Sequence, residues 1–271
     1  MEGADLVMAG LAAGHRPQVV FVRAERAEEL VLRLGLTGGA GGVSAAGAAA
    51  GPAPAGAAAV PPPAVYPVEE HVAHKIGTLD TPADVMAVFP LPGRRPFSPP
   101  PGAGDDLLVV YADAIGDPGN VGTLLRAAVA FGAAAFVAAP GTADLYGPKT
   151  VRAGMGAVFA LPLYQDVTLA DLVARLSGAE VVGLAAHGGE ALHEASLRRP
   201  AVLVIGAERA GISAQAAPHV TRPVTIALAP GRPQAVESLN AGVAGAIALY
   251  EFSRRRAGAP DTPPTAAAEE G

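Results

Sequence analysis

The stretch LLVVYADAIGDPGNVGTLLRAAVAFGAAAFVAA, residues 107–139, decides the fold of this chain of 271 residues. It opens with residues 107–112, which are apolar and rich in valine and predict a buried strand. A Pro-Gly turn follows, and residues 120–131 carry apolar side chains at the spacing of a helix. Residues 135–139 are apolar again and predict a second strand. A strand, a helix and a strand in this order predict one unit of a parallel α/β sheet.

The same alternation continues through the second half of the chain. We expect further strands at 181–186, 201–205 and 223–227. A final helix is expected at 239–256, where Leu239, Val243, Ile247 and Tyr250 recur at helical spacing. The pattern therefore predicts a mainly parallel α/β domain over residues 105–256, followed by a disordered tail at 257–271.

The first part of the chain predicts a smaller α/β domain at residues 1–98. Its expected helices and strands are listed in chain order: a helix around Leu6, Val7 and Leu11, a strand at 18–24, helices at 27–36 and 67–76, and a strand at 84–91. Residues at about 38–63 are almost entirely Gly, Ala and Pro, which offer little side-chain surface to bury and predict a disordered insert. The proline-rich stretch 96–104 is interpreted as the linker between the two domains.

Composition limits the kind of protein this is. The chain has no cysteine, which excludes disulfides, thiolate metal sites and cysteine nucleophiles. Glu2 and Asp5 stand where a signal peptide carries positive charge, and Gly132, Pro140 and Gly141 interrupt the uncharged run 127–143, so we expect a cytoplasmic protein without a membrane span.

Charge gives a weaker indication about partners. The net charge of −6 weighs mildly against nucleic acid, because phosphate contacts need Lys and Arg. Arginines nevertheless cluster at 94–95, 198–199 and 254–256. On charge patterning alone, these clusters fit a solvated surface as well as an RNA-binding surface.

Three segments carry residues that their secondary structure does not require. In the first, 113–132, Asn120 and Arg126 lie outside the apolar stripe, although an Asn at a helix cap and an Arg on a wet face would look the same. In the second, 202–213, a buried strand runs into Gly206, Glu208 and Gly211. Parallel sheets bind ligands at this end of a strand, but an ordinary turn fits as well.

The third segment, 224–256, runs from a strand through a loop into the last helix. Glu237, Ser238 and Asn240 stand near the expected start of that helix, and Ser238 has the chemistry of a simple N-cap. Gly242 and Gly245 inside the helix reduce its stability unless another element packs closely against them.

Taken together and in this order, the three segments resemble the SpoU/TrmH family of RNA ribose 2′-O-methyltransferases, in the SPOUT class. The residues that match the family pattern are Asn120, Gly122, Arg126, Phe131 and Gly132, then Gly206, Glu208 and Gly211, then Ser238, Leu239 and Asn240, with weaker matches at Arg152 and Gly156. The sequence departs from the pattern at Ala227-Leu228, where the family has Pro-Met, in a longer loop at 230–236, and at Gly154, where Ser is common. The segments 2–14 and 81–89 resemble the substrate-binding domain that often precedes the family's catalytic domain.

The resemblance implies a fold and a reaction. It implies a SPOUT α/β domain with a trefoil knot, preceded by a small α/β domain that binds the RNA substrate, in a homodimer whose two chains line the RNA site. S-adenosyl-L-methionine would be the cofactor, held by backbone groups of Gly206, Ile226 and Leu239. The implied catalytic residues are Asn120, Arg126, Glu208, Ser238 and Asn240. Arginine has a very high pKa, so we interpret Arg126 as a clamp on phosphate and ribose rather than as the base.

The expected substrate is structured RNA, and the extra N-terminal domain favours ribosomal RNA. Two alternatives stay open, a tRNA 2′-O-methyltransferase and a non-catalytic RNA-binding or ribosome-assembly protein of the same fold. A nucleotide-binding oxidoreductase would need a Gly-x-Gly-x-x-Gly turn after an early strand, and the sequence has none.

Two other patterns are rejected as functional motifs. Residues 141–150 resemble a P-loop, but the spacing is one residue too long and Pro148 removes a backbone donor. His71 and His74 have no further cluster of ligands, so we expect no metal.

Overall fold

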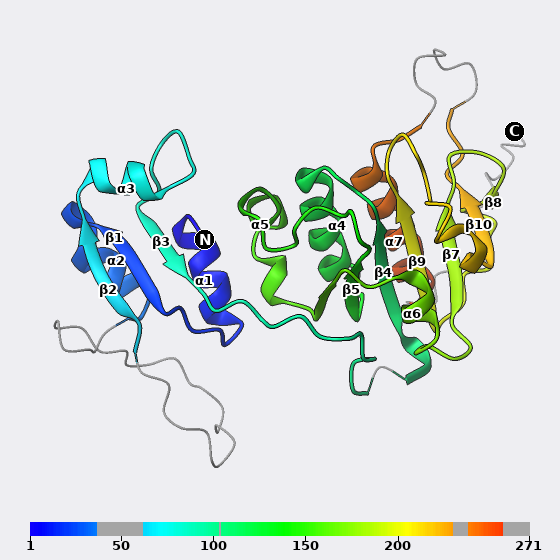
Figure 1. Ribbon diagram of the computed structural model, residues 1–271, viewed down its shortest axis with the longest axis horizontal. Helices are drawn as coiled ribbons and strands as arrows, with labels where there is room; N and C mark the ends of the chain where they lie inside the picture. The colour runs from blue at the N-terminus through cyan, green and yellow to red at the C-terminus, as the bar shows by residue number, and fades with distance from the viewer. Residues whose placement is uncertain (37–61, 103, 230–237, 257–271) are drawn as a thin grey trace, which may run out of the picture. The chain divides into compact units, whose positions relative to one another are not determined.

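The computed structural model describes residues 1–36, 62–102, 104–229 and 238–256, and the chain forms two compact units, Met1–Gly93 and Arg94–Gly271 (Figure 1). Most of the expected insert at 38–63, the tail at 257–271 and the loop 230–237 lie outside the described residues. Within the described part of the chain, no helix is long and apolar enough to cross a membrane.

The first unit is a three-stranded sheet in the order β2-β1-β3. β1 runs parallel to β2 and antiparallel to β3. The buried residues of the strands, among them Val20 and Val22, pack with Val7, Leu30 and Val31. The elements are α1 (Ala4–Ala12), β1 (Val19–Arg23), α2 (Ala27–Arg33), β2 (Ala64–Val68), α3 (Glu70–Ile76) and β3 (Val85–Val88).

The helix expected at 67–76 is wrong at its start. Pro67 and Val68 belong to β2, and α3 begins only at Glu70. β2 is an edge strand, because it pairs only with β1 in the described sheet. An edge strand tolerates a proline, since the missing N–H can face away from the partner strand.

The second unit is a seven-stranded sheet in the order β6-β5-β4-β9-β7-β10-β8, and every pairing is parallel. This confirms the mainly parallel α/β prediction. The strands are β4 (Leu108–Asp113), β5 (Ala135–Ala138), β6 (Leu163–Gln165), β7 (Glu180–Leu184), β8 (Glu190–Ala191), β9 (Ala201–Gly206) and β10 (Arg222–Thr225). The helices are α4 (Pro118–Ala130), α5 (Pro148–Gly154), α6 (Leu169–Val173) and α7 (Ala241–Arg256).

Helices cover the two faces of this sheet (Figure 1). On one face α7 packs against α4 and β9, with Gly245 against Leu124 and Ile205. On the other face, α6 contributes Leu169 and Leu172 to a core shared with the buried residues of β4 and β9. Strands covered on both faces explain the continuous apolar runs in the sequence.

The central strand β4 is where the order of the sheet reverses. β5 and β6 follow β4 on one side, and β9 lies on the other side. Parallel sheets bind ligands in the crevice that opens at the carboxyl ends of the strands at such a reversal. The trefoil knot implied by the family stays a prediction, since the connection 230–237 lies outside the described residues.

The expected domain boundary is displaced. Phe97 was assigned to the first domain, but it is only 1% exposed and belongs to the core of the second unit. Its ring packs edge-on against Tyr164, with 5.0 Å between ring centroids. The hydroxyl of Tyr164 donates to the carbonyl of Ser98 at 2.9 Å. Residues 97–98 therefore belong to the second unit, because one buried aromatic ring fixes the segment despite its prolines.

The stripe that marks the last helix in the sequence does not face the core. Val243, Ile247 and Tyr250 are 46%, 37% and 51% exposed, and Leu239 precedes α7. The buried face is formed by small residues and by Leu249 and Phe252. This follows from the close approach of α4, since a Cβ on Gly245 would lie 2.2 Å from Leu124 Cδ2.

Candidate active site

The first part of the site is the start of α4. Asp117 caps this helix, and its Oδ1 accepts a hydrogen bond from the backbone N–H of Asn120 at 2.8 Å. Asn120 therefore lies inside the first turn of the helix and is neither the cap nor part of the preceding turn. Its side chain is 8% exposed, and its Nδ2 donates to Glu208 Oε1 at 2.9 Å.

The second part is the tight turn after β9. Ala207 N–H donates to Gly211 O at 3.0 Å, and Gly211 N–H donates to Ala207 O at 2.8 Å. A Cβ on Gly206 would lie 2.2 Å from the carbonyl carbon of Gly211, so this position must be glycine for the turn to double back. The glycine that suggested close approach of a ligand thus also permits close approach of the chain to itself.

Asp113 anchors the same turn, and the sequence analysis did not assign it a role. Its carboxylate is 3% exposed and accepts hydrogen bonds from the Ser213 N–H at 2.6 Å and the Ser213 Oγ at 3.1 Å. Asp113 ends β4, so this contact ties the β9 turn to the strand that leads into α4. Burial, and next to it the charge of Asp113, raise the pKa of Tyr111 above its usual value.

The third part is the start of α7. Asn240 Oδ1 accepts a hydrogen bond from the Val243 N–H at 3.2 Å, in the manner of an N-cap. The alternative that Ser238 caps the helix is therefore wrong. Asn240 Nδ2 also donates to Asn120 Oδ1 at 2.7 Å and to Glu208 Oε1 at 2.5 Å.

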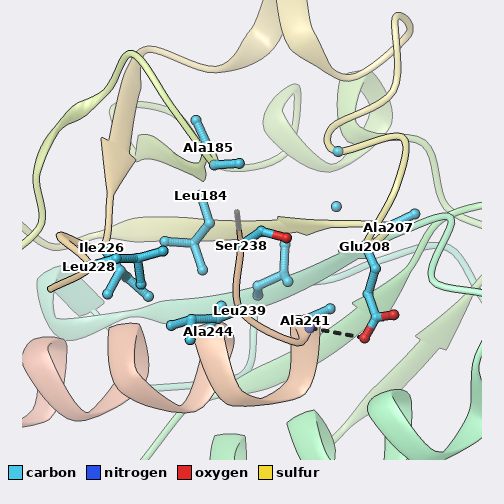
Figure 2. A pocket seen from close by; sticks show the side chains of 14 residues that line it. Leu184, Ala185, Ala207, Glu208, Ile226, Leu228, Ser238, Leu239, Ala241 and Ala244 are labelled. Carbon is cyan, nitrogen blue, oxygen red and sulfur yellow. Dashed lines mark hydrogen bonds between the residues drawn. The ribbon is translucent and has the colours of Figure 1, made fainter. Parts of the chain in front are cut away.

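Asn120, Glu208 and Asn240 thus form one hydrogen-bonded cluster, which we call the polar triad. They come from the three segments singled out in the sequence. Glu208 Oε1 also lies 3.4 Å from the N–H of Ala241, as Figure 2 shows. The hydrogen bonds of this carboxylate with Asn120, Asn240 and Ala241 all reach Oε1, and within the described residues Oε2 has no partner. Glu208 can therefore accept one further hydrogen bond from a bound group.

A pocket of about 620 Å³ adjoins the polar triad. It lies at the carboxyl ends of β7, β9 and β10, beside the start of α7, and its lining residues are Leu184, Ala185, Ala186, Ile205, Gly206, Ala207, Glu208, Gly211, Ile226, Leu228, Ser238, Leu239, Ala241 and Ala244. All three expected cofactor residues line it, as do Glu208 and Ser238. The contribution of β7 was missed, although its strand end was visible in the sequence.

The pocket has two chemically different ends. In Figure 2, Leu184, Ile226 and Leu228 gather toward one end, and Glu208 lies at the other. Within the described residues, the backbone groups of Ile226 and Leu239 have no hydrogen-bond partner. Such groups can bind the polar edge of a ligand whose body lies against the apolar side chains.

Arg126 is not part of the polar triad. It lies six residues after Asn120 on α4, about 9 Å further along the helix axis, and is exposed. No hydrogen bond or ion pair joins its guanidinium to another described residue. The structure therefore places this expected catalytic residue on the open face of α4.

The glycines of the motifs hold the helices close together. A Cβ on Gly122 would lie 2.5 Å from Ala153 Cβ and from the Thr150 carbonyl oxygen, so α4 and α5 touch there. Gly245 allows the equally close contact between α7 and α4, and Gly242 lies against Thr123. The inference that something packs closely against the helix glycines is confirmed.

The two patterns rejected as functional motifs, at His71 and His74 and at residues 141–150, both lie in the described part of the chain. Among the described residues no group of three or more His, Cys, Asp or Glu side chains is arranged to hold a metal ion. His71 and His74 border an open hollow with Glu25, Glu69, Glu70 and Lys75. Pro148 begins α5, whose first turn has no side-chain cap.

Comparison with known proteins shows which family the chain resembles. Residues 107–250 match the SpoU rRNA Methylase family. An uncharacterized tRNA/rRNA methyltransferase of Synechocystis is 32% identical over 200 residues, which are 73% of this chain and 70% of that protein. The 23S rRNA (guanosine(2553)-2′-O)-methyltransferase RlmP of Bacillus subtilis is 31% identical over 189 residues, covering 69% of this chain and 71% of that protein.

A solved structure shows the same architecture over nearly the whole chain. The AdoMet-bound rRNA methyltransferase of Sinorhizobium meliloti has a TM-score of 0.70 and 26% identity, covering 94% of this chain and 86% of that chain. The chain spans only 38% of the length of another Synechocystis relative, with which it is 37% identical over 151 residues. With the family pattern matched over more than half of its length, the chain belongs to the SpoU rRNA methylase family.

Proposed function

We propose that this protein transfers a methyl group from S-adenosylmethionine to a ribose 2′-hydroxyl of ribosomal RNA. The observation that carries the proposal is the meeting of Asn120, Glu208 and Asn240 at one end of the pocket formed by the carboxyl ends of β7, β9 and β10. The B. subtilis relative is named for this reaction on 23S rRNA, and the S. meliloti rRNA methyltransferase was solved with AdoMet bound. The protein would act where ribosomes are present, which we take to be the cytoplasm.

The pocket fits the proposed cofactor. Leu184, Ile226 and Leu228 would hold its adenine ring by apolar contact, and the free backbone groups of Ile226 and Leu239 would bind the polar atoms around it. Ala207, Ala241 and Ala244 are small and leave room in the pocket. When bound, S-adenosylmethionine supplies the electrophilic methyl group.

The polar triad would position the ribose. The ribose 2′-oxygen must approach the methyl carbon in line with the sulfur–methyl bond that breaks. The proton of the 2′-hydroxyl must leave as the new C–O bond forms. Glu208 Oε1 is held by two side-chain amides, while Oε2 is open to accept the hydrogen of the ribose hydroxyl. Ser238 lines the same pocket and is exposed, so its hydroxyl is available to the same substrate.

We further propose that the protein is a homodimer that pairs through α4 and α7. Val129 on α4 and Val243, Ile247 and Tyr250 on α7 are all exposed apolar residues, and these two helices pack side by side. We propose that a second copy of the chain packs against this surface, which would explain why Arg126 lies on the open face of α4. Dimerisation would cover these exposed apolar residues. It would also bring the guanidinium of Arg126 to the polar triad of the partner chain.

Two measurements test the dimer. Ile247→Glu should shift the sedimentation of the protein toward the monomer, whereas Leu32→Glu, at an exposed leucine of the first unit, should leave it unchanged. Mixing Arg126→Ala chains with Glu208→Ala chains should restore activity, because one site of each mixed dimer then has both groups. A monomeric wild-type protein would refute the dimer, and a mixture without activity would refute the shared site.

The first unit would bind the RNA substrate. Tyr66 is 52% exposed and stacks on Phe21 of the neighbouring strand, with ring centroids 5.9 Å apart. Exposed aromatic rings on a sheet can stack on unpaired bases. The chain has no tryptophan, so Tyr66→Trp would introduce a single fluorescent reporter whose emission should change when RNA binds. Unchanged emission at saturating RNA would argue against this surface.

The proposed reaction is tested by incubating the protein with unmodified 23S rRNA made by transcription and S-adenosylmethionine, followed by mapping of 2′-O-methyl positions. One modified ribose should appear with wild-type protein and none with Glu208→Ala. Methylation of tRNA transcripts in place of 23S rRNA would support the tRNA alternative. RNA binding without methylation of either would support the non-catalytic alternative.

A further inference from the structure

The turn after β9 carries an arginine directly beside the polar triad. The reciprocal hydrogen bonds between Ala207 and Gly211 close a short loop of Glu208, Arg209 and Ala210. Glu208 is bound by Asn120 and Asn240, whereas Arg209 is exposed at the tip of the loop. Glu208 and Arg209 are consecutive residues of this loop, and their Cα atoms are therefore about 3.8 Å apart.

Two further contacts fix the backbone of this loop, in addition to the reciprocal hydrogen bonds between Ala207 and Gly211. Gly206 lies against the carbonyl of Gly211 at a distance that no side chain would allow. The buried carboxylate of Asp113 holds both the N–H and the hydroxyl of Ser213. Arg209 is therefore presented by a rigid support, so little backbone entropy is lost when its side chain binds a ligand.

Several basic side chains of the second unit have carboxylate acceptors within the chain, whereas Arg209, like Arg126 and Arg175, has none among the described residues. The pairs are Arg94 with Asp166, Arg199 with Asp106, Arg222 with Glu180 and Glu190, and Arg254 with Glu251. In the described residues Arg209 forms no ion pair, and the hydrogen bonds of the neighbouring Glu208 carboxylate go to the two asparagines. Arg209 is therefore an exposed cation at the edge of the site whose N–H donors are available to a bound group.

We infer that Arg209 binds a phosphate of the RNA backbone next to the ribose that is methylated, and so sets the register of the RNA strand in the site. The inference rests on the proposed function and assigns a substrate contact to Arg209, which stands at a variable position of the second motif, between Glu208 and Gly211. The planar guanidinium presents a fork of N–H donors that matches two phosphate oxygens. A phosphate contact fixes position without reading the base, so Arg209 would contribute to RNA affinity but not to the choice of base.

The experiment compares wild-type protein with Arg209→Ala, Arg209→Lys and the control Arg175→Ala, using 23S rRNA transcribed in vitro. Arg175 is an exposed arginine that follows α6, and its side chain likewise has no partner among the described residues. For Arg209→Ala, the KM for RNA should rise roughly ten-fold, the loss of one charged hydrogen-bonding contact. The slope of log K for RNA against log salt should become shallower by about 0.7–0.9, the effect of one phosphate contact.

The turnover number and the affinity for S-adenosylmethionine should change less than about two-fold, because Arg209 would bind RNA before and during the reaction alike. Arg209→Lys should keep the wild-type salt slope, but its KM for RNA should lie between the values of wild-type protein and Arg209→Ala. An unchanged salt slope, or a fall in turnover at constant KM, would overturn the inference. If wild-type protein methylates no RNA, the proposed function fails, and the salt slope alone still decides whether Arg209 contacts phosphate.

Discussion

Replacing Glu208 tests whether the polar triad holds the site together. In Glu208→Ala, Asn120 and Asn240 each lose the carboxylate, at 2.9 Å and 2.5 Å respectively, while their own contact at 2.7 Å remains. Hydrogen bonds to a charged group contribute about 1.5–3 kcal/mol each, and solvent at this partly exposed site reduces that value. We expect a loss of about 2 kcal/mol, which lowers the melting temperature of a unit of this size by about 4–8 °C.

The matched variant is Glu208→Gln, which keeps a carbonyl oxygen as acceptor and removes the charge. We expect it to lose about half as much stability and to methylate RNA at least ten-fold more slowly, because charged acceptors bind about twice as strongly as neutral ones. Thermal melting and methyl transfer on the same preparations give both readouts. A double-mutant cycle with Asn240→Ala should show a coupling of about 1 kcal/mol. Additive effects, or a melting temperature unchanged in Glu208→Ala, would refute the reasoning.

Three further predictions follow from the same geometry. Arg126→Ala should abolish methylation while melting and cofactor affinity stay near wild type, because the side chain is exposed and opens no cavity; near-normal turnover would contradict its role. Gly245→Ala should destabilise the protein by about 1–3 kcal/mol, because its Cβ would lie 2.2 Å from buried Leu124, whereas Gly242→Ala, with 3.1 Å to Thr123, should be nearly neutral. S-adenosylmethionine should bind in calorimetry with chelator present, and binding that needs a divalent metal would refute the cofactor assignment.

Much of the catalytic unit could be predicted from sequence because its strands are buried on both faces. Long apolar runs identified β4, β5, β7 and β9 to within two residues. The shorter elements β6, α5 and α6 were missed, since three to seven residues give too little periodicity to detect. The family resemblance named Asn120, Glu208 and Asn240 together, and the structure brings these residues into contact although they lie far apart in sequence.

Local geometry was predicted less well. The helix was expected to begin at Asn120, yet Asp117 caps α4 and Pro118 begins it, a start signal that the sequence already contained. The apolar stripe of α7 gave the right helix but not its buried face, because small residues form that contact. Side-chain volume, rather than hydrophobicity, decided which face packs.

The polar triad also has a consequence for how the protein matures. Its hydrogen bonds join residues separated by 88 positions between Asn120 and Glu208, and by 120 positions between Asn120 and Asn240. Contacts of such long range form late, because the intervening chain must first be ordered. On the ribosome, α4 and the β9 turn emerge well before Asn240, so a nascent chain that stops short of Asn240 has only Asn120 and Glu208 of the polar triad. Synthesis of the last segment, with Asn240 and α7, therefore completes the site, and a truncated chain ending before Asn240 should bind neither cofactor nor ribose in productive geometry.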